Sequence, residues 1–118
     1  MAVKENIIQT KTFSFALNII ALYKSLKEKN EFILSKQLLR SGTSIGANVE
    51  EALAGQTRKD FIAKMSIASK EARETRYWLR LLQSSQIHKT DYSSYLKDIE
   101  EIINILTAIV KTSQTKSK

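Results

Sequence analysis

The residues best suited to chemistry in this 118-residue chain are cations, and they gather in one segment. The formal net charge is +7, and residues 58–90 hold eight Lys and Arg against three Asp and Glu. On a helical wheel, four arginines fall within an arc of about 60°, with two lysines beside it. This set, the basic arc, consists of Arg58, Arg73, Arg76 and Arg80, with Lys59 and Lys70. Because guanidinium groups bind carboxylates and phosphates in a bidentate way, the basic arc predicts an acidic partner.

Three interpretations of the basic arc stay open at this point. The arginines pair with Glu50, Glu51 or Glu74, within or between subunits; or they bind the phosphates of a nucleic acid; or they form a solvated surface without a partner. Ion pairs on protein surfaces are common and individually weak, so the sequence alone does not decide among the three.

Residue types used for catalysis and metal binding are scarce. The chain has no cysteine and one histidine, His88, which falls in a predicted turn without a positioned partner. No Glu-x-x-His motif is present, so the usual ligands of a di-metal helical bundle are missing. We therefore expect a non-enzymatic protein without a metal or another cofactor. The lack of cysteine also fits a reducing cytoplasm.

Carboxylates occur in three pairs: Glu50 and Glu51, Glu71 and Glu74, Glu100 and Glu101. Adjacent residues on a helix point about 100° apart, so the first and third pairs do not converge on one site. Glu71 and Glu74 share a helix face, but arginines surround them, which favours a salt-bridge network over acid–base catalysis.

The elements that position these residues are predicted to be helices. The chain has no proline and only three glycines, and it is rich in Leu, Ile, Ala, Lys and Glu. Apolar periodicity predicts helices over residues 6–29, 32–54, 58–85 and 91–111, with a frayed tail at 112–118. Gly55 suits a left-handed position after the second helix, and Thr57 with Asp60 suits the start of the third. The fold class is therefore predicted to be all-α in a single domain, 1–118. Short connections between successive helices predict an antiparallel up-down-up-down four-helix bundle.

Apolar residues exceed what one bundle core needs. The helix predicted at 91–111 carries a second apolar stripe, and the helix at 6–29 is apolar over much of its circumference. The second stripe consists of Tyr95, Ile102, Ile105 and Ile109. Exposed apolar surface favours association, so we expect a homo-oligomer.

The run Phe13–Tyr23 is too short to span a bilayer, which needs about 20 apolar residues. No small-residue cleavage site follows it, so we expect a buried helix rather than a signal peptide, and no membrane partner.

Small residues fill the middle of the second predicted helix, around Gly42 and Gly46. Each interior glycine costs about 1 kcal/mol relative to alanine, and a close approach of another helix would offset that cost. Periodicity alone leaves a continuous helix and a loop equally open. Arg40 and Asn48 flank the pair, which argues against a membrane dimer motif. We expect the glycines to contact another subunit.

A mixed stripe on the third predicted helix suits close packing or a subunit contact. It includes Glu71, Glu74 and Trp78, beside the apolar Ile67 and Leu81. A base-stacking role for Trp78 would be unusual on a rigid helix, because stacking platforms generally lie on sheets or in open grooves.

Four stretches carry a resemblance to a known family: Leu39-Arg40-Ser41, Ser44-Ile45-Gly46-Ala47-Asn48, Lys59-Asp60-Phe61 and Arg73-Glu74-Thr75-x-Tyr77-Trp78-Leu79. They make the chain similar to the four-helix-bundle proteins encoded in 23S rRNA intervening sequences, a family that includes accessory variability proteins of diversity-generating retroelements. The chain departs from the pattern at residues 50–54 and at Arg76, where relatives often carry an acidic residue. The resemblance favours a continuous second helix.

The resemblance implies a homopentameric, barrel-like assembly with a basic surface. In the retroelement branch it also implies binding to a reverse transcriptase and to nucleic acid. We therefore expect an oligomeric scaffold that binds RNA or DNA through backbone charge. The alternative is a protein-interaction module whose arginines bind an acidic or polymerase-type partner.

Overall fold

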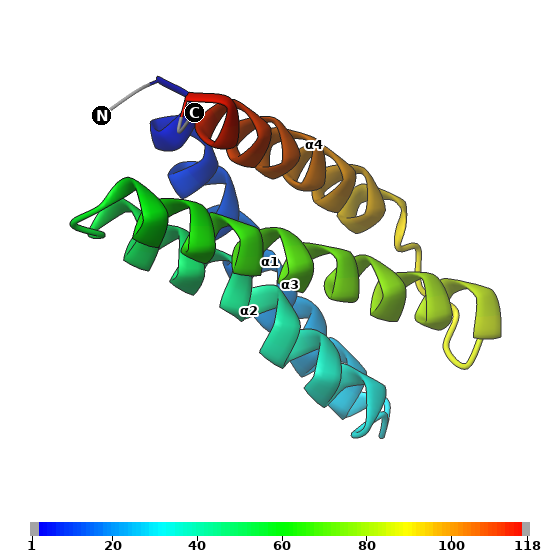
Figure 1. Cartoon of the computed structure of the whole chain (residues 1–118). Helices are drawn as coiled ribbons and strands as arrows, with labels where there is room; N and C mark the ends of the chain where they lie inside the picture. The colour runs from blue at the N-terminus through cyan, green and yellow to red at the C-terminus, as the bar shows by residue number, and fades with distance from the viewer. Residues whose placement is uncertain (1–2, 117–118) are drawn as a thin grey trace.

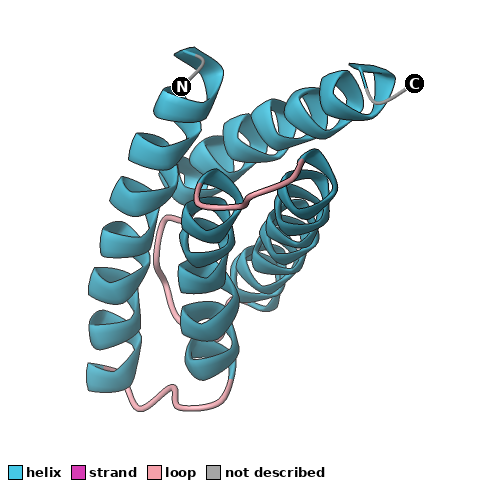
Figure 2. Ribbon diagram, turned by 60° about the vertical axis from the view of Figure 1, so that its left-hand side comes forward, coloured by secondary structure: helices cyan, strands magenta, loops and turns pink. Residues whose placement is uncertain are grey.

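Four helices make up the fold in the computed structural model, which describes residues 3–116 (Figures 1 and 2). They are α1 (Val3–Glu28), α2 (Leu34–Leu53), α3 (Arg58–Ser85) and α4 (Ser93–Lys116), and no strand occurs in the described range. Each helix packs against its neighbour in the sequence, and α1 also packs against α4. The start of α1 and the end of α4 lie at the same end of the molecule (Figure 1). The all-α class and the four helices are confirmed, in an arrangement compatible with the predicted bundle.

The core follows the predicted seams. On α1 the seam is buried at Phe15, Ile19, Leu22 and Leu26, and on α3 it is buried from Met65 to Leu82. Residues at a 3–4 spacing share one helix face, which is why periodicity located them. On the second stripe of α4, Ile102 and Ile109 are buried in the same core, and Tyr95 and Ile105 are partly buried against it. The stripe therefore packs on the core of its own chain and leaves less apolar surface uncovered than expected.

Two predicted ends differ from the structure. The helix α4 continues to Lys116, and Ser113 is buried, so the frayed tail predicted at 112–118 is wrong for residues 112–116; residues 117–118 lie outside the described range. Gly55 follows α2 without a positive φ, so it does not take the predicted left-handed conformation. Left-handed residues instead end α1 at Asn30 and α3 at Gln86.

Side-chain caps fix the starts of α2 and α3. The Thr57 hydroxyl accepts a hydrogen bond from the Asp60 amide at 3.0 Å, as predicted. At α2 the nearly buried Glu31 carboxylate accepts the backbone amides of residues 33, 34 and 35 at 2.8–3.0 Å. These amides have no partner within the helix, so the carboxylate satisfies them and also opposes the positive end of the helix dipole.

The glycines of α2 face α1 of the same chain. The helix is continuous through both glycines, which confirms the continuous-helix interpretation. A β-carbon added at Gly42 would lie 2.9 Å from Cγ2 of Ile19, and one added at Gly46 would lie 3.4 Å from Oγ1 of Thr12. The predicted close approach of another helix is thus present at Gly42. The approaching helix is α1 of the same chain, so the expectation that the glycines contact another subunit is wrong.

An apolar strip remains exposed on α1. The side chains of Phe13, Leu17 and Ile20 are 64%, 54% and 36% exposed, and their 4–3 spacing places them on one face. We refer to these three residues as the α1 apolar face. Beside it, a groove of about 610 Å³ between α1 and α2 is lined by Ile20, Tyr23 and Leu39 among others. Within residues 3–116, no helix is both long and apolar enough to cross a membrane.

Candidate functional site

A row of hollows follows the seam where α3 packs against α4. One hollow, of about 520 Å³, lies where α3 begins and α4 ends, and is lined by Arg58, Lys59, Ile62 and Lys116. The next, of about 260 Å³, is lined by Ser66, Ser69, Arg73, Thr107, Val110, Lys111 and Gln114. We call the two hollows together the basic groove. Five of its eleven lining residues are cations and none is acidic.

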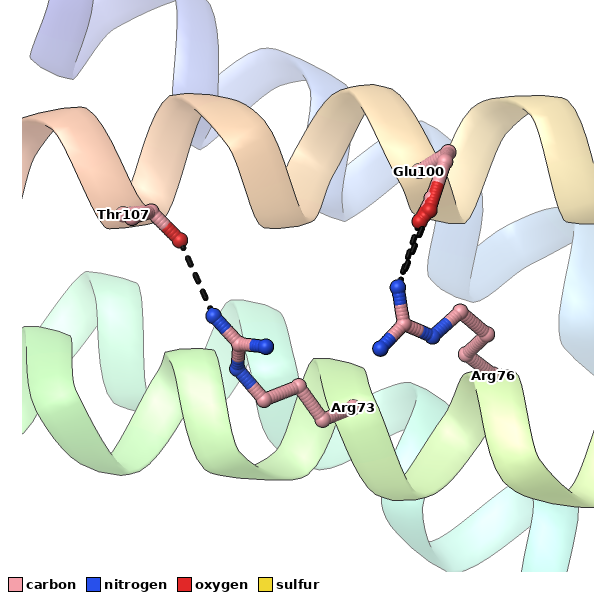
Figure 3. Close-up of polar contacts among 4 residues, drawn as sticks. All are labelled: Arg73, Arg76, Glu100 and Thr107. Carbon is pink, nitrogen blue, oxygen red and sulfur yellow. Dashed lines mark hydrogen bonds and ion pairs between the residues drawn. The ribbon is translucent and has the colours of Figure 1, made fainter.

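Two arginines of the basic arc reach across to α4 (Figure 3). Arg76 Nη1 lies 2.5 and 3.0 Å from the two carboxylate oxygens of Glu100, and Arg73 Nη2 donates to the Thr107 hydroxyl at 3.2 Å. The prediction that an arginine pairs with a glutamate is right in kind, but the partner is none of Glu50, Glu51 or Glu74. The ion pair is partly exposed, at 33% for the Arg76 side chain and 46% for that of Glu100, so its contribution to stability is small.

The other cations of the basic arc are exposed. Arg58, Lys59, Lys70 and Arg80 make no hydrogen bond or ion pair through their side chains within the described range. Arg58 and Lys59 line the basic groove, whereas Lys70 and Arg80 do not line either hollow. The structure therefore divides the predicted set: three members line the groove, one is neutralised by Glu100, and two lie outside it.

Two groove cations were missed by the sequence analysis. Lys111 and Lys116 belong to α4, whose segment has balanced charge and whose end was predicted to fray. A signal was present in the spacing, because residues 97, 100, 104, 107, 111 and 114 follow one helix face. Along that face Glu100 is the single acidic residue, and Lys97 and Lys111 are basic.

The glutamates have other partners than the predicted network. Glu50 accepts from Gln9 at 3.0 and 3.1 Å, and Glu51 pairs with Lys64 at 2.7 Å. Glu74 accepts from the Trp78 indole at 3.2 Å, and Glu71 forms no ion pair within the described residues. The predicted salt-bridge network around Glu71 and Glu74 is therefore not formed within the described part of one chain.

The α1–α4 seam holds its own ion pair. Lys11 Nζ lies 2.7 Å from Glu101 Oε2, and this hydrogen bond holds the pKa of the Glu101 carboxyl below its usual value. Adjacent glutamates on α4 thus face different neighbours: Glu100 pairs with α3 and Glu101 with α1. This matches the predicted divergence of that pair.

The remaining residues predicted for a subunit contact or close packing lie on α2 and α3. Arg40 is exposed on α2, and the Asn48 amide donates to the Ser44 carbonyl oxygen one turn earlier at 2.8 Å. Trp78 is half-buried against the core, and its ring meets the Tyr77 ring edge to face, with centroids 5.2 Å apart. His88 lies half-buried in the loop between α3 and α4. No group of three or more His, Cys, Asp or Glu side chains within the described range is arranged to hold a metal ion.

Comparison with known proteins identifies a family and a similar solved structure. The family model described as 23S rRNA-intervening sequence protein matches residues 4–108. A crystal structure of a protein with unknown function from the S23 ribosomal protein family of Bacteroides thetaiotaomicron has a TM-score of 0.86 and 50% sequence identity; the match covers 92% of this chain and 99% of that one. No functionally curated protein matches the chain.

Proposed function

The chain belongs to the 23S rRNA-intervening sequence protein family, and from that premise we propose that it is a non-enzymatic, oligomeric scaffold whose basic groove binds RNA or DNA. The observation that carries the proposal is the composition of the groove, with five cations and no carboxylate among its lining residues. A polyanion is the ligand that such a surface attracts most strongly. The lack of cysteine supports a cytoplasmic location.

Groove geometry favours contacts to phosphates over contacts to bases. The cations lie on two packed helices, and the hollow that holds Arg73 and Lys111 is also lined by the hydrogen-bonding side chains of Ser66, Ser69, Thr107 and Gln114. Phosphate contacts position a protein on a nucleic acid without reading its sequence. We therefore expect sequence-tolerant binding that depends strongly on salt, because each neutralised phosphate releases counterions.

Salt dependence of binding tests the proposal. A labelled 20-nucleotide DNA or RNA is titrated with protein at 50, 100, 200 and 300 mM salt, and the affinity is measured by fluorescence anisotropy. We expect binding at 50 mM that weakens steeply with salt, and similar affinities for unrelated sequences. No binding at 50 mM salt contradicts the proposal.

Self-association through the α1 apolar face is part of the same proposal. Its three side chains are exposed, and one of them, Ile20, also lines the groove between α1 and α2; burying such a patch stabilises an oligomer. Membership of the family favours a pentamer, with five times the 13.4 kDa mass of the chain. Five copies raise the formal charge from +7 to roughly +35, which strengthens attraction of a polyanion.

Light scattering on a matched pair of variants tests this face. Leu17→Glu places a charge in the α1 apolar face, whereas Ile87→Glu places one on a loop residue of the same 54% exposure. We expect Leu17→Glu to lower the mass towards that of one chain and Ile87→Glu to leave it unchanged. An unaffected oligomer in Leu17→Glu would exclude this face as the interface.

An acidic or polymerase-type protein partner, such as a reverse transcriptase, is the alternative. It relies on Arg73, Arg76 and Arg80, of which the first two already contact α4. We rank it second for that reason. Affinity capture with and without nuclease distinguishes the two, because a protein partner that survives nuclease treatment supports the alternative.

A further inference from the structure

An exposed tyrosine lies among the free cations of α3, beside the basic groove. Tyr77 is 52% exposed, although aromatic rings bury large apolar areas and are usually covered. On α3 it follows Arg73 by four residues and precedes Arg80 by three, and Lys70 lies two turns before it. Residues at these spacings share one helix face. Tyr77 therefore lies on a strip in which Lys70 and Arg80 are exposed and make no ion pair within the described part of the chain.

The ring of Tyr77 packs against the ring of Trp78. Trp78 packs against the hydrophobic core and meets the Tyr77 ring at an interplanar angle of 67°, with centroids 5.2 Å apart. The Trp78 indole also donates to Glu74 at 3.2 Å, which fixes the indole on the helix. An aromatic ring held against another ring loses little freedom when a flat ligand stacks on it, which favours binding.

Stacking platforms generally lie on sheets or in open grooves, and Trp78 is half-buried against the core, but the Tyr77 ring is exposed beside the basic groove. From this arrangement we propose that Tyr77 stacks on an unpaired base, and that the ligand of this face is single-stranded nucleic acid. Lys70 and Arg80 contact phosphates on either side of that base. The proposal rests on the proposed function for binding of a polyanion, and it adds the strandedness of the ligand and a contact to a base. In a duplex the bases are already stacked on one another, so Tyr77 has nothing to stack on; in a single strand every base offers a flat face.

Charge and stacking are separated by two ligands with equal numbers of phosphates. One is a labelled single-stranded oligomer of 20 thymidines, and the other is a 20-unit abasic strand, which has the backbone without bases. At one fixed low salt concentration, we expect the wild type to bind the thymidine strand about tenfold more tightly, because one base–aromatic stack is worth roughly that factor. A 20-base-pair duplex binds through charge alone.

Variants assign the difference to Tyr77. Tyr77→Leu removes the ring and is expected to lose about tenfold in affinity for the thymidine strand, with no change for the abasic strand. Tyr77→Phe keeps the ring and is expected to retain wild-type affinity for both. Phe32→Leu is the matched control, because Phe32 is a 56% exposed aromatic residue in the loop between α1 and α2. It is expected to change neither affinity.

Fluorescence of the wild type gives a readout that needs no variant. Trp78 is the single tryptophan of the chain and touches Tyr77, so its emission reports on a base bound there. We expect the thymidine strand to change this emission and the abasic strand to leave it unchanged.

The outcomes distinguish failure of the stacking proposal from failure of phosphate binding. Equal affinities of the wild type for the thymidine and abasic strands, or equal losses on both in Tyr77→Leu, overturn the stacking proposal and leave phosphate binding intact. Failure of the wild type to bind either strand at low salt overturns phosphate binding and stacking together.

Discussion

Arg76 on α3 and Glu100 on α4 form an ion pair across the seam that carries the basic groove (Figure 3). Glu100 is the one carboxylate on the α4 face formed by residues 97, 100, 104, 107, 111 and 114. The pair therefore withholds one guanidinium from any ligand that follows the seam. Because both side chains are partly exposed, the pair contributes little to stability, and its main effect is on the local charge.

Removal of the Glu100 charge is expected to strengthen binding of a polyanion. In Glu100→Gln, Arg76 is no longer neutralised, and affinity for a 20-nucleotide strand at low salt is expected to rise roughly fivefold, since a unit charge near a phosphate in water is worth about 1 kcal/mol. Glu101→Gln is the matched control, because it makes the same charge change beside Lys11 on the α1–α4 seam. An equal rise in both variants would attribute the effect to net charge and not to Arg76.

The two glycines of α2 are expected to respond in opposite directions to alanine. In Gly42→Ala the new methyl group meets Ile19 at 2.9 Å; this branched side chain is fully buried and stiff, so overpacking of about 1–3 kcal/mol outweighs the gain in helix propensity. In Gly46→Ala the nearest atom lies at 3.4 Å, so the gain of about 1 kcal/mol dominates. Thermal unfolding is expected to give a lower Tm for Gly42→Ala and an equal or higher Tm for Gly46→Ala.

Oligomer mass completes that test. Because both glycines face α1 of the same chain, light scattering is expected to give the wild-type mass for both alanine variants. Dissociation of Gly42→Ala with an unchanged Tm would place the contact between subunits instead.

Tyr92 limits stability at alkaline pH. Its hydroxyl is buried and has no hydrogen-bond partner within the described residues, and desolvation raises its pKa above the usual value of 10.0, with Thr90 nearby opposing part of the shift. The folded protein thus holds the phenol proton more tightly than the unfolded chain does. This contribution to stability is complete below about pH 10 and is lost as pH rises through the folded-state pKa.

Tyr92→Phe removes the buried hydroxyl and its titration. Because an unpaired buried polar group costs roughly 1–3 kcal/mol, we expect Tyr92→Phe to match or exceed the wild-type Tm at pH 7. The variant is expected to lose less stability than the wild type between pH 9 and pH 11, measured by urea unfolding. A lower Tm at pH 7 would show that the hydroxyl has a stabilising partner.

Periodicity predicted which residues of each helix are buried but not which helix lies opposite them. Ile19 and Leu79 were placed in the core because apolar residues at a 3–4 spacing must share one face. The neighbour of Gly42 and the partner of Arg76 depend on how two helices are rotated and shifted against each other, which a single-helix wheel does not contain. The pairing of Arg76 with Glu100 was therefore not predicted, although the spacing of residues along α4 shows which helix face Glu100 occupies.

The end of α4 was missed for a different reason. Residues 112–116 carry no apolar side chain, so they lack the signal that marks a helix packed on a core. The buried residue there is Ser113. Because the helix continues to residue 116, Lys116 lines the basic groove. Lys111 was not predicted for a different reason: charge summed along the chain does not show which helix face a lysine occupies.

The central claim, that the basic groove binds nucleic acid through phosphate contacts, is tested most directly by the salt slope of two charge-matched variants. Lys59→Gln/Lys111→Gln removes two exposed groove cations, whereas Lys36→Gln/Lys89→Gln removes two exposed lysines from elsewhere. Anisotropy titrations from 50 to 300 mM salt give the slope of log affinity against log salt. The groove variant is expected to lower the magnitude of this slope by about 1 to 2 for each bound subunit, since each phosphate contact contributes roughly 0.7–0.9, and the control variant is expected to keep the wild-type slope. Equal slopes in the two variants would contradict the assignment of binding to the groove.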